Sequence, residues 1–150
     1  MLTAYLIGYF SQFQMVADFV FKFFSRSERY TVHHKMIVDG IFGIGFRGEL
    51  SDQIQQLFRT INADKNKICI AVDIPSGGNG LTGSASDAVL RCTATITFGA
   101  AKLGLFLTPL SDKCGAIFLA KIGIPDAAFE ELAYPVNHIS SDKVKEILPP

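Results

Sequence analysis

The stretch that decides the fold runs from Met36 to Gly77 and reads MIVDGIFGIGFRGELSDQIQQLFRTINADKNKICIAVDIPSG. It contains an apolar run, a glycine-rich turn, a segment of helical periodicity and a second apolar run, with Asp39 and Asp73 near the ends of the two runs. This order predicts a right-handed βαβ unit with parallel strands. Ligands of such units bind beside the loops at the carboxyl ends of the strands, so we take the unit as the functional core.

The parts of this unit follow from local patterns. Met36 to Phe42 and Ile68 to Val72 are short apolar runs, which are typical of buried parallel strands. Between them, Ser51 suits the N-cap of a helix that runs to Asn62. The apolar face of this helix is expected to pack on the sheet through Ile54, Leu57, Phe58 and Ile61.

Further elements follow downstream. Pro75 to Gly80 has the composition of a loop, and Ala85 to Arg91 is expected to form a short helix. Thr93 to Phe98 predicts a third strand because its β-branched residues alternate. Gly99 to Gly104 is a loop that carries Lys102, and Ala116 to Ala120 is a fourth apolar run.

The segment before this core is harder to interpret. Leu2 to Phe24 is apolar and close in length to a bilayer span. Its polar residues Gln14, Asp18 and Lys22 recur every four positions, which favours an amphipathic helix over a membrane span or a signal peptide. Ser25 to Lys35 reads as a polar connector. We therefore divide the chain into residues 1–35, of uncertain role, and a domain over residues 36–150.

The composition limits the functions to consider. The chain has 150 residues, enough for one domain, and 14 basic residues balance 14 acidic ones. This balance argues against an electrostatic nucleic-acid surface and favours a small-molecule partner. The three cysteines are widely spaced and form no CxxC pair, which argues against a zinc site or a disulfide framework. Free thiols suit a reducing compartment, so we expect a cytoplasmic protein.

A glycine motif follows the first predicted strand. Gly43, Gly45 and Gly48 match G-x-G-x-x-G, a pattern that lets backbone amides approach a phosphate. One such match is weak evidence, and glycines used only for tight turning are the alternative. Taken alone, the motif would suggest a nicotinamide-dependent dehydrogenase.

Two carboxylates and two further polar residues accompany this motif. Asp39 and Asp73 are expected at the same edge of the sheet, where one could hold a cation and the other could exchange a proton. Burial of Asp39 requires a cation or hydrogen-bond donors nearby. Ser76 offers oxygen to the same cation, and Lys102 could contact a phosphate or orient a carboxylate. The alternatives are helix-capping aspartates, a turn serine and an exposed lysine.

Four motifs in order resemble the NAD(P)H-hydrate epimerase family, the amino-terminal YjeF-type domain. The resemblance covers roughly Met36 to Ala127. Its motifs are Val38-Asp39-Gly40-Ile41-Phe42-Gly43-Ile44-Gly45, Ala71-Val72-Asp73-Ile74-Pro75-Ser76-Gly77, Thr97-Phe98-Gly99-Ala100-Ala101-Lys102-Leu103-Gly104 and Ile122-Gly123-Ile124-Pro125.

The resemblance implies a Rossmann-like three-layer α/β/α fold with a mostly parallel sheet, and epimerisation of hydrated NADH and NADPH (NADHX and NADPHX). It also implies a potassium ion held by Asp39 and Ser76, with Asp73 as the substrate-contacting acid and our candidate catalytic residue. Lys102 is expected near the substrate. The implied substrate-binding loop consists of Gly43, Ile44, Gly45, Phe46, Arg47, Gly48 and Glu49.

The sequence leaves open the extent of the domain, its fusion to a second domain, its oligomeric state and an alternative function. The family's glycine- and asparagine-rich GNNGGDG-type loop has no counterpart before Met36, so we expect an N-terminally truncated domain. Leu148-Pro149-Pro150 is similar to the junction that leads into an ADP-dependent dehydratase domain, and fusion to such a domain is left open, as is a homodimer. The alternative function is a non-catalytic nucleotide-binding or interaction module derived from the same fold.

Overall fold

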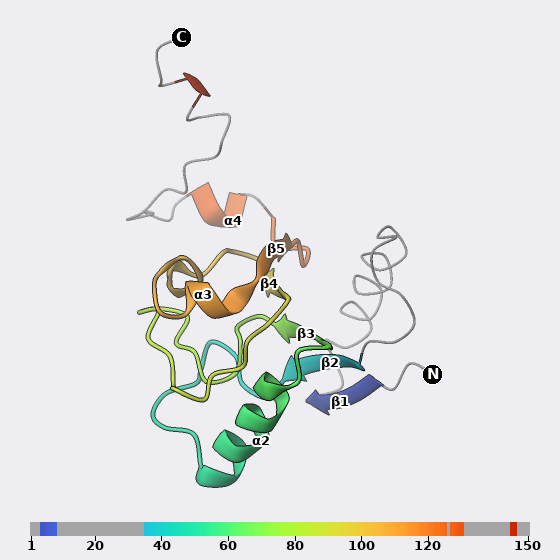
Figure 1. Cartoon of the computed structure of the whole chain (residues 1–150). Coiled ribbons are helices and arrows are strands. Elements are labelled where there is room, and N and C mark those ends of the chain that lie inside the picture. Colours follow the sequence, from blue (N-terminus) through green and yellow to red (C-terminus); the bar gives the residue numbers. More distant parts are fainter. Residues whose placement is uncertain (1–3, 9–34, 126, 131–144, 147–150) are drawn as a thin grey trace.

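The structure is a computed structural model that describes residues 4–8, 35–125, 127–130 and 145–146. Five strands and several short helices make up this part of the chain (Figure 1). The strands are β1 (Ala4–Gly8), β2 (Lys35–Gly40), β3 (Lys67–Val72), β4 (Ala94–Phe98) and β5 (Ala116–Ala120). The helices are α2 (Asp52–Ala63), the 3-10 helix η1 (Leu103–Phe106), α3 (Ser111–Cys114) and α4 (Ala127–Glu130).

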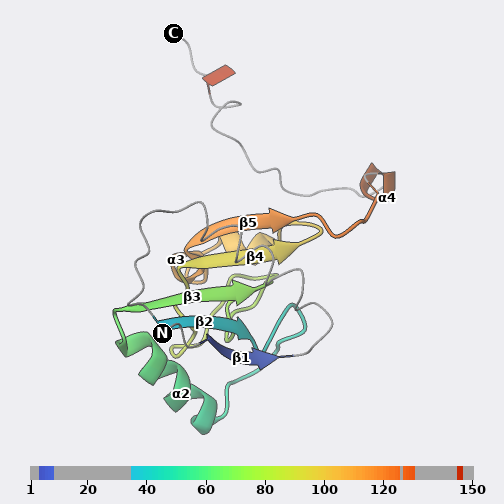
Figure 2. The same cartoon turned by 90° about the vertical axis from the view of Figure 1, so that its right-hand side faces the viewer.

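The strands form one parallel sheet in the order β1-β2-β3-β4-β5, and their arrowheads point to the same end (Figure 2). Every step moves one place in the same direction, so right-handed crossovers must fall on one face of the sheet. Accordingly, α2 and α3 lie on the same side of it (Figure 1). The predicted α/β class with a parallel sheet is confirmed.

The N-terminal prediction is wrong where it can be checked. Ala4–Gly8 is a strand whose residues pair in parallel with Met36 to Gly40. A short apolar run fits a helix or a strand equally well by periodicity, and here the neighbouring strand decides. Residues 9–24 of the predicted helix and residues 25–34 of the predicted connector lie outside the described residues. The division at residue 35 stays a prediction, although β1 joins the same sheet as β2.

Helix α2 confirms the predicted crossover and corrects two details. Ser51 holds the N-cap position, but its side chain makes no capping hydrogen bond. The Gln55 amide side chain in the first turns of α2 donates to the Leu50 carbonyl at 2.9 Å, which ties the preceding loop to the helix without capping it. Phe58 is fully buried, whereas Leu57 is 40% exposed and does not belong to the packed face.

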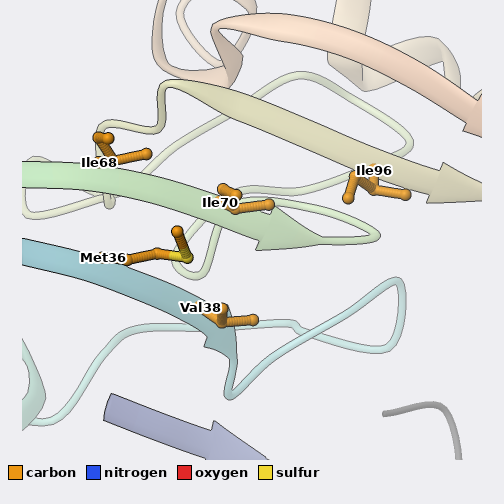
Figure 3. Close-up of a cluster of buried hydrophobic side chains, with 5 residues drawn as sticks. All are labelled: Met36, Val38, Ile68, Ile70 and Ile96. Atoms are coloured by element: carbon orange, nitrogen blue, oxygen red, sulfur yellow. The ribbon is translucent and has the colours of Figure 1, made fainter. Parts of the chain in front are cut away.

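The core lies on both faces of the sheet. Alternate residues of β2, β3 and β4 point to one face, as the strand period of two requires, and form a continuous apolar cluster (Figure 3). Its buried members are Met36, Val38, Ile68, Ile70 and Ile96. On the other face Phe58 packs with Leu50, Ala88 and Leu90. The first cluster packs β2, β3 and β4 together, and the carboxyl ends of these strands carry the candidate site.

The connection between β3 and β4 contains no helix at residues 85–91, so that prediction is wrong. Ala85 instead forms an isolated bridge with Gly78. The Asn62 side chain at the end of α2 donates to the Val89 carbonyl at 2.8 Å and accepts from the Arg91 amide at 2.9 Å. These bonds tie the segment to the end of α2, which local propensity does not reveal.

The cysteines are free thiols, and Cys69 lies in the buried strand β3 as predicted. Its sulfur is 3.6 Å from that of Cys92. The hydrogen bond with Cys69, together with burial, raises the pKa of the Cys92 thiol well above its usual range. Burial also raises the pKa of Cys114 to about 11. Thiols held neutral in this way are poor nucleophiles.

Among the described residues, every helix is too short or too polar to traverse a bilayer.

Candidate active site

The candidate site lies at the carboxyl ends of β2, β3 and β4. Asp39 is the second-last residue of β2 and pairs in register with Ala71 of β3. Asp73 follows the last residue of β3, and Lys102 lies in the loop after β4. Because neighbouring parallel strands end at the same edge, the structure brings both aspartates to one edge of the sheet, as the sequence predicts.

Asp39 forms a closed pair with Ser76. The Ser76 amide donates to Asp39 Oδ2 at 2.7 Å, and the Ser76 hydroxyl donates to Oδ1 at 2.5 Å. The Ile41 amide also approaches Oδ1, at 3.4 Å. Both side chains are buried, with Asp39 2% and Ser76 0% exposed. Burial raises the pKa of Asp39, although the hydrogen bonds from Ser76 and Ile41 oppose this effect. The predicted donors around Asp39 are therefore present.

The implied potassium ion can be tested against this pair. Hard cations are held by several oxygen ligands at once. Here Ser76 Oγ accepts from the Phe42 amide at 3.0 Å, and the Ser76 carbonyl accepts from the Leu90 amide at 3.2 Å. The described residues contain no cluster of three or more His, Cys, Asp or Glu side chains suited to a metal. Asp39 and Ser76 both supply oxygen, but in this structure they are hydrogen-bonded to one another, and the potassium ion stays a prediction.

Asp73 has an unusual backbone. Its φ is +71°, and the Ile74 amide donates to the Val72 carbonyl at 3.0 Å. A bond between residues i and i+2 around a central residue of positive φ defines the rare and strained form of the γ-turn. The Asp73 amide donates to the Ile96 carbonyl of β4 at 2.7 Å, which anchors the turn. Strained residues of this kind cluster at functional sites.

Lys102 and Thr97 contact the Asp73 carboxylate. Lys102 Nζ lies 2.6 Å from Asp73 Oδ1, 3.1 Å from Thr97 Oγ1 and 2.8 Å from the Phe98 carbonyl oxygen. Thr97 Oγ1 lies 3.1 Å from the same Oδ1. The side chains of Lys102 and Asp73 are 14% and 18% exposed, so this group remains open to solvent, unlike Asp39. Lys102 thus lies beside the predicted acid, as expected.

Sequence reasoning gave Thr97 no role, although it belongs to one of the quoted motifs. It is fully buried in the strand ATITF, whose other residues are mostly apolar or β-branched. A buried hydroxyl requires a hydrogen-bond partner. A threonine within an apolar strand therefore indicates a hydrogen-bond partner nearby, and this sequence feature could have pointed to Thr97.

The glycine loop passes over Asp73. A Cβ atom placed on Gly43 would lie 3.8 Å from Asp73 Oδ2, so that oxygen faces Gly43. The Phe46 amide donates to the Gly43 carbonyl at 3.0 Å and closes a turn, while Gly48 adopts a φ of +93°. Helix α2 begins only at Asp52, so the motif does not open directly into a helix as a dinucleotide-binding turn does.

The second half of the loop borders a cavity of about 480 Å³. Residues 46–50 line it together with Gln55 of α2 and parts of the β3–β4 connection, among them Asn79 and Asp87. Its volume is within the usual range for small-molecule sites. Gly43, Ile44, Gly45, Asp73 and Lys102 are not among its lining residues, so the predicted site residues fall into two adjoining parts joined by the loop.

Comparison with known proteins gives these residues a family context. The model of the family described as "YjeF-related protein N-terminus" matches residues 9–104. The chain is 42% identical over 92 residues to the bifunctional NAD(P)H-hydrate repair enzyme Nnr of Dictyoglomus turgidum, which is 61% of this chain and 18% of that protein. It is 38% identical over 91 residues to the NAD(P)H-hydrate epimerase of Weissella koreensis, again 61% of this chain and 41% of the relative.

The chain therefore spans from about a fifth to about two fifths of the length of these relatives. The family match extends over more than half of the chain and includes Asp39, Asp73, Ser76 and Lys102. It also includes the glycine loop and the ends of β2, β3 and β4 that hold these residues. The chain thus belongs to the family of YjeF-related N-terminal domains.

Proposed function

We propose that this chain acts as an NAD(P)H-hydrate epimerase, an isomerase that interconverts the R and S forms of hydrated NADH and NADPH. The observation that carries the proposal is the Asp73 carboxylate. It has one oxygen held by Lys102 and Thr97 and the other directed at the glycine loop. The relatives named as NAD(P)H-hydrate epimerases support the same reaction.

The chemistry assigned to Asp73 is proton exchange. Inversion at the hydrated carbon requires its bond to the hydroxyl oxygen to break and re-form on the opposite face. A proton has to reach that oxygen as it leaves as water and has to be taken up again when water returns. A carboxyl group within hydrogen-bond reach serves both steps, because its acid form donates the proton to the leaving oxygen and the resulting carboxylate takes a proton back from the returning water. We assign the proton exchange to Oδ2, because Oδ1 already accepts hydrogen bonds from Thr97 and Lys102.

Substrate binding is assigned to the predicted loop and the adjoining cavity. The loop contributes Gly43, Ile44 and Gly45 beside Asp73, and Phe46, Arg47, Gly48 and Glu49 along the cavity. This division suits an elongated substrate such as a dinucleotide, with the hydrated ring near Asp73 and another part in the cavity. Nucleotide contact at this loop is part of the proposal.

The test is an assay of the purified chain. We expect it to accelerate interconversion of separated R-NADHX and S-NADHX, followed by chromatography. An interconversion rate equal to that without protein would overturn catalysis by this chain.

A non-catalytic nucleotide-binding module is the second candidate, favoured by the closed Asp39–Ser76 pair, which leaves no ready cation ligands there. It predicts binding of NADP-type nucleotides in calorimetry without any turnover. Binding accompanied by epimerisation would exclude it.

The potassium ion implied by the resemblance stays a prediction, because the Asp39–Ser76 pair would have to open to admit it. If it binds, the melting temperature in potassium chloride should exceed that in sodium chloride at equal ionic strength. Equal melting temperatures would count against the ion.

We also propose a cytoplasmic location, since the three free thiols suit a reducing compartment. A homodimer and fusion to an ADP-dependent dehydratase domain stay open. Relatives named as bifunctional repair enzymes favour the fusion. Light scattering of the purified chain decides the first, and the complete coding sequence decides the second.

A further inference from the structure

The contacts of Lys102 show how its hydrogen-bonding capacity is used. A lysine ammonium has three protons to donate and accepts nothing. Its three partners here are Asp73 Oδ1, Thr97 Oγ1 and the Phe98 carbonyl oxygen. Each proton therefore has a protein acceptor, and none is left over for a substrate phosphate. This favours orientation of a carboxylate over phosphate binding, the two roles that the sequence left open.

The direction of the Thr97 bond follows from the same inventory. Lys102 can only donate to Thr97 Oγ1, so the single hydroxyl proton of Thr97 is free to be donated to Asp73 Oδ1. Oδ1 thus accepts from both an ammonium and a hydroxyl. Among the described residues no group donates to Oδ2, which faces Gly43.

We propose that Lys102 and Thr97 are positioning residues that fix Oδ1 of Asp73 and thereby aim Oδ2 at the substrate. The inference rests on the proposed function of Asp73 as the proton-exchanging acid. The strained turn at Asp73 sets the direction of the backbone, and the two donors set the rotation of the carboxylate. A misplaced reacting group is costly: an error of about 1 Å can reduce a rate about 100-fold.

The first experiment uses paired substitutions at Thr97. Thr97→Val keeps the shape and removes the hydroxyl, whereas Thr97→Ser keeps the hydroxyl and removes a methyl group. We expect kcat for NADHX epimerisation to fall about 10- to 100-fold in Thr97→Val, with KM little changed. Thr97→Ser should restore most of kcat. Equal kcat in the two variants would overturn a role for the hydroxyl.

The second experiment separates positioning from substrate binding at Lys102. Lys102→Met should reduce kcat with little change in KM, while Lys65→Met removes a charge from an exposed turn as the matched control. A raised KM with unchanged kcat would mean that Lys102 binds the substrate and would overturn the proposal. Unchanged kcat in a less stable protein would reduce Lys102 to a structural role.

A third measurement does not depend on activity. The melting temperatures of Asp73→Asn, Lys102→Met and the double variant form a cycle, in which contacting residues give non-additive shifts. Additive shifts would overturn the proposed contact. If the wild-type chain is inactive but the shifts are non-additive, the proposed function fails while the fixing of Oδ1 stands. Crystal structures of Thr97→Val and Thr97→Ser then decide whether the carboxylate rotates when the hydroxyl is lost.

Discussion

The two aspartates differ more than their matching places at the ends of β2 and β3 suggest. Asp39 is 2% exposed, and both its oxygens accept hydrogen bonds from the protein. The Asp73 side chain is 18% exposed, and only Oδ1 is held. The first carboxylate ties the β3–β4 connection to β2, while the second keeps an oxygen available. Equivalent positions in neighbouring strands thus hold one carboxylate closed by protein donors and another that keeps an oxygen free, which is the difference on which the proposed chemical role of Asp73 rests.

The largest expected effect is the loss of activity in Asp73→Asn. Asn has nearly the shape of Asp and tolerates a positive φ better than most residues, so the fold should survive. Removal of a general acid-base group should lower kcat by about 100- to 10,000-fold. The epimerisation assay measures this loss, and Asp112→Asn, at an exposed position of α3, is the control. Retention of activity in Asp73→Asn would remove Asp73 from the mechanism.

Asp39→Ala should chiefly reduce stability, whereas Asp73→Asn should chiefly reduce activity. The substitution leaves the amide and hydroxyl of Ser76 and the Ile41 amide without their acceptor. Buried donors without partners cost about 1–3 kcal/mol each, so we expect a loss of roughly 3 kcal/mol or more in the free energy of unfolding. Urea denaturation measures it, with Asp112→Ala as the exposed control. A loss no greater than in that control would contradict the structural role.

Gly43→Ala tests whether activity depends on the space next to Asp73 Oδ2, the oxygen that accepts no hydrogen bond from the described residues. The added methyl group would meet Oδ2 at 3.8 Å, an ordinary contact, and Gly43 has no positive φ, so folding should not suffer. We expect activity to fall about 10-fold, because the methyl group occupies space next to the reacting oxygen.

Gly45→Ala is the matched variant, since an added Cβ there has no neighbour within 4 Å. It should change stability as little as Gly43→Ala and reduce activity less. Equal losses of activity would show that proximity to Oδ2 is not what matters.

The smallest expected effect is the pH dependence of the contribution that Asp39 makes to the free energy of unfolding. Burial raises the folded-state pKa of Asp39 above its usual value of 3.8. A raised pKa means that this contribution is fully present below pH 3.8 and is lost as the pH rises through the folded-state value. The advantage of wild type over Asp39→Ala in unfolding free energy should therefore shrink as the pH rises through that range. An advantage that grows with pH would contradict the direction of the shift.

Local sequence patterns predicted the elements whose character is set by near neighbours. Strands β2 and β3 are apolar runs, and α2 has a clear helical period, so they were found. Ala4–Gly8 was misread because pairing with β2, which lies far along the chain, makes it a strand. Residues 85–91 were misread because Asn62 holds them in place from a distance.

The site was predictable in its members but not in their partners. The motifs brought attention to Asp39, Ser76, Asp73 and Lys102. The partner of each aspartate lies far away in the sequence. Asp39 and Ser76 are 37 positions apart, and Asp73 and Lys102 are 29 positions apart. Such contacts depend on the order of strands in the sheet, which periodicity does not contain. Only the structure shows that all three ammonium protons of Lys102 are donated to protein acceptors.

The positive φ of Asp73 has an evolutionary consequence. Most side chains are strained in such a backbone, and aspartate and asparagine tolerate a positive φ better than most. Aspartate and asparagine codons differ by a single base. If Asp73 exchanges the proton as proposed, one point mutation can abolish that exchange while leaving the turn, the sheet and the loop intact. Under the proposed function, that one step would end catalysis and leave a folded chain that could still bind the nucleotide.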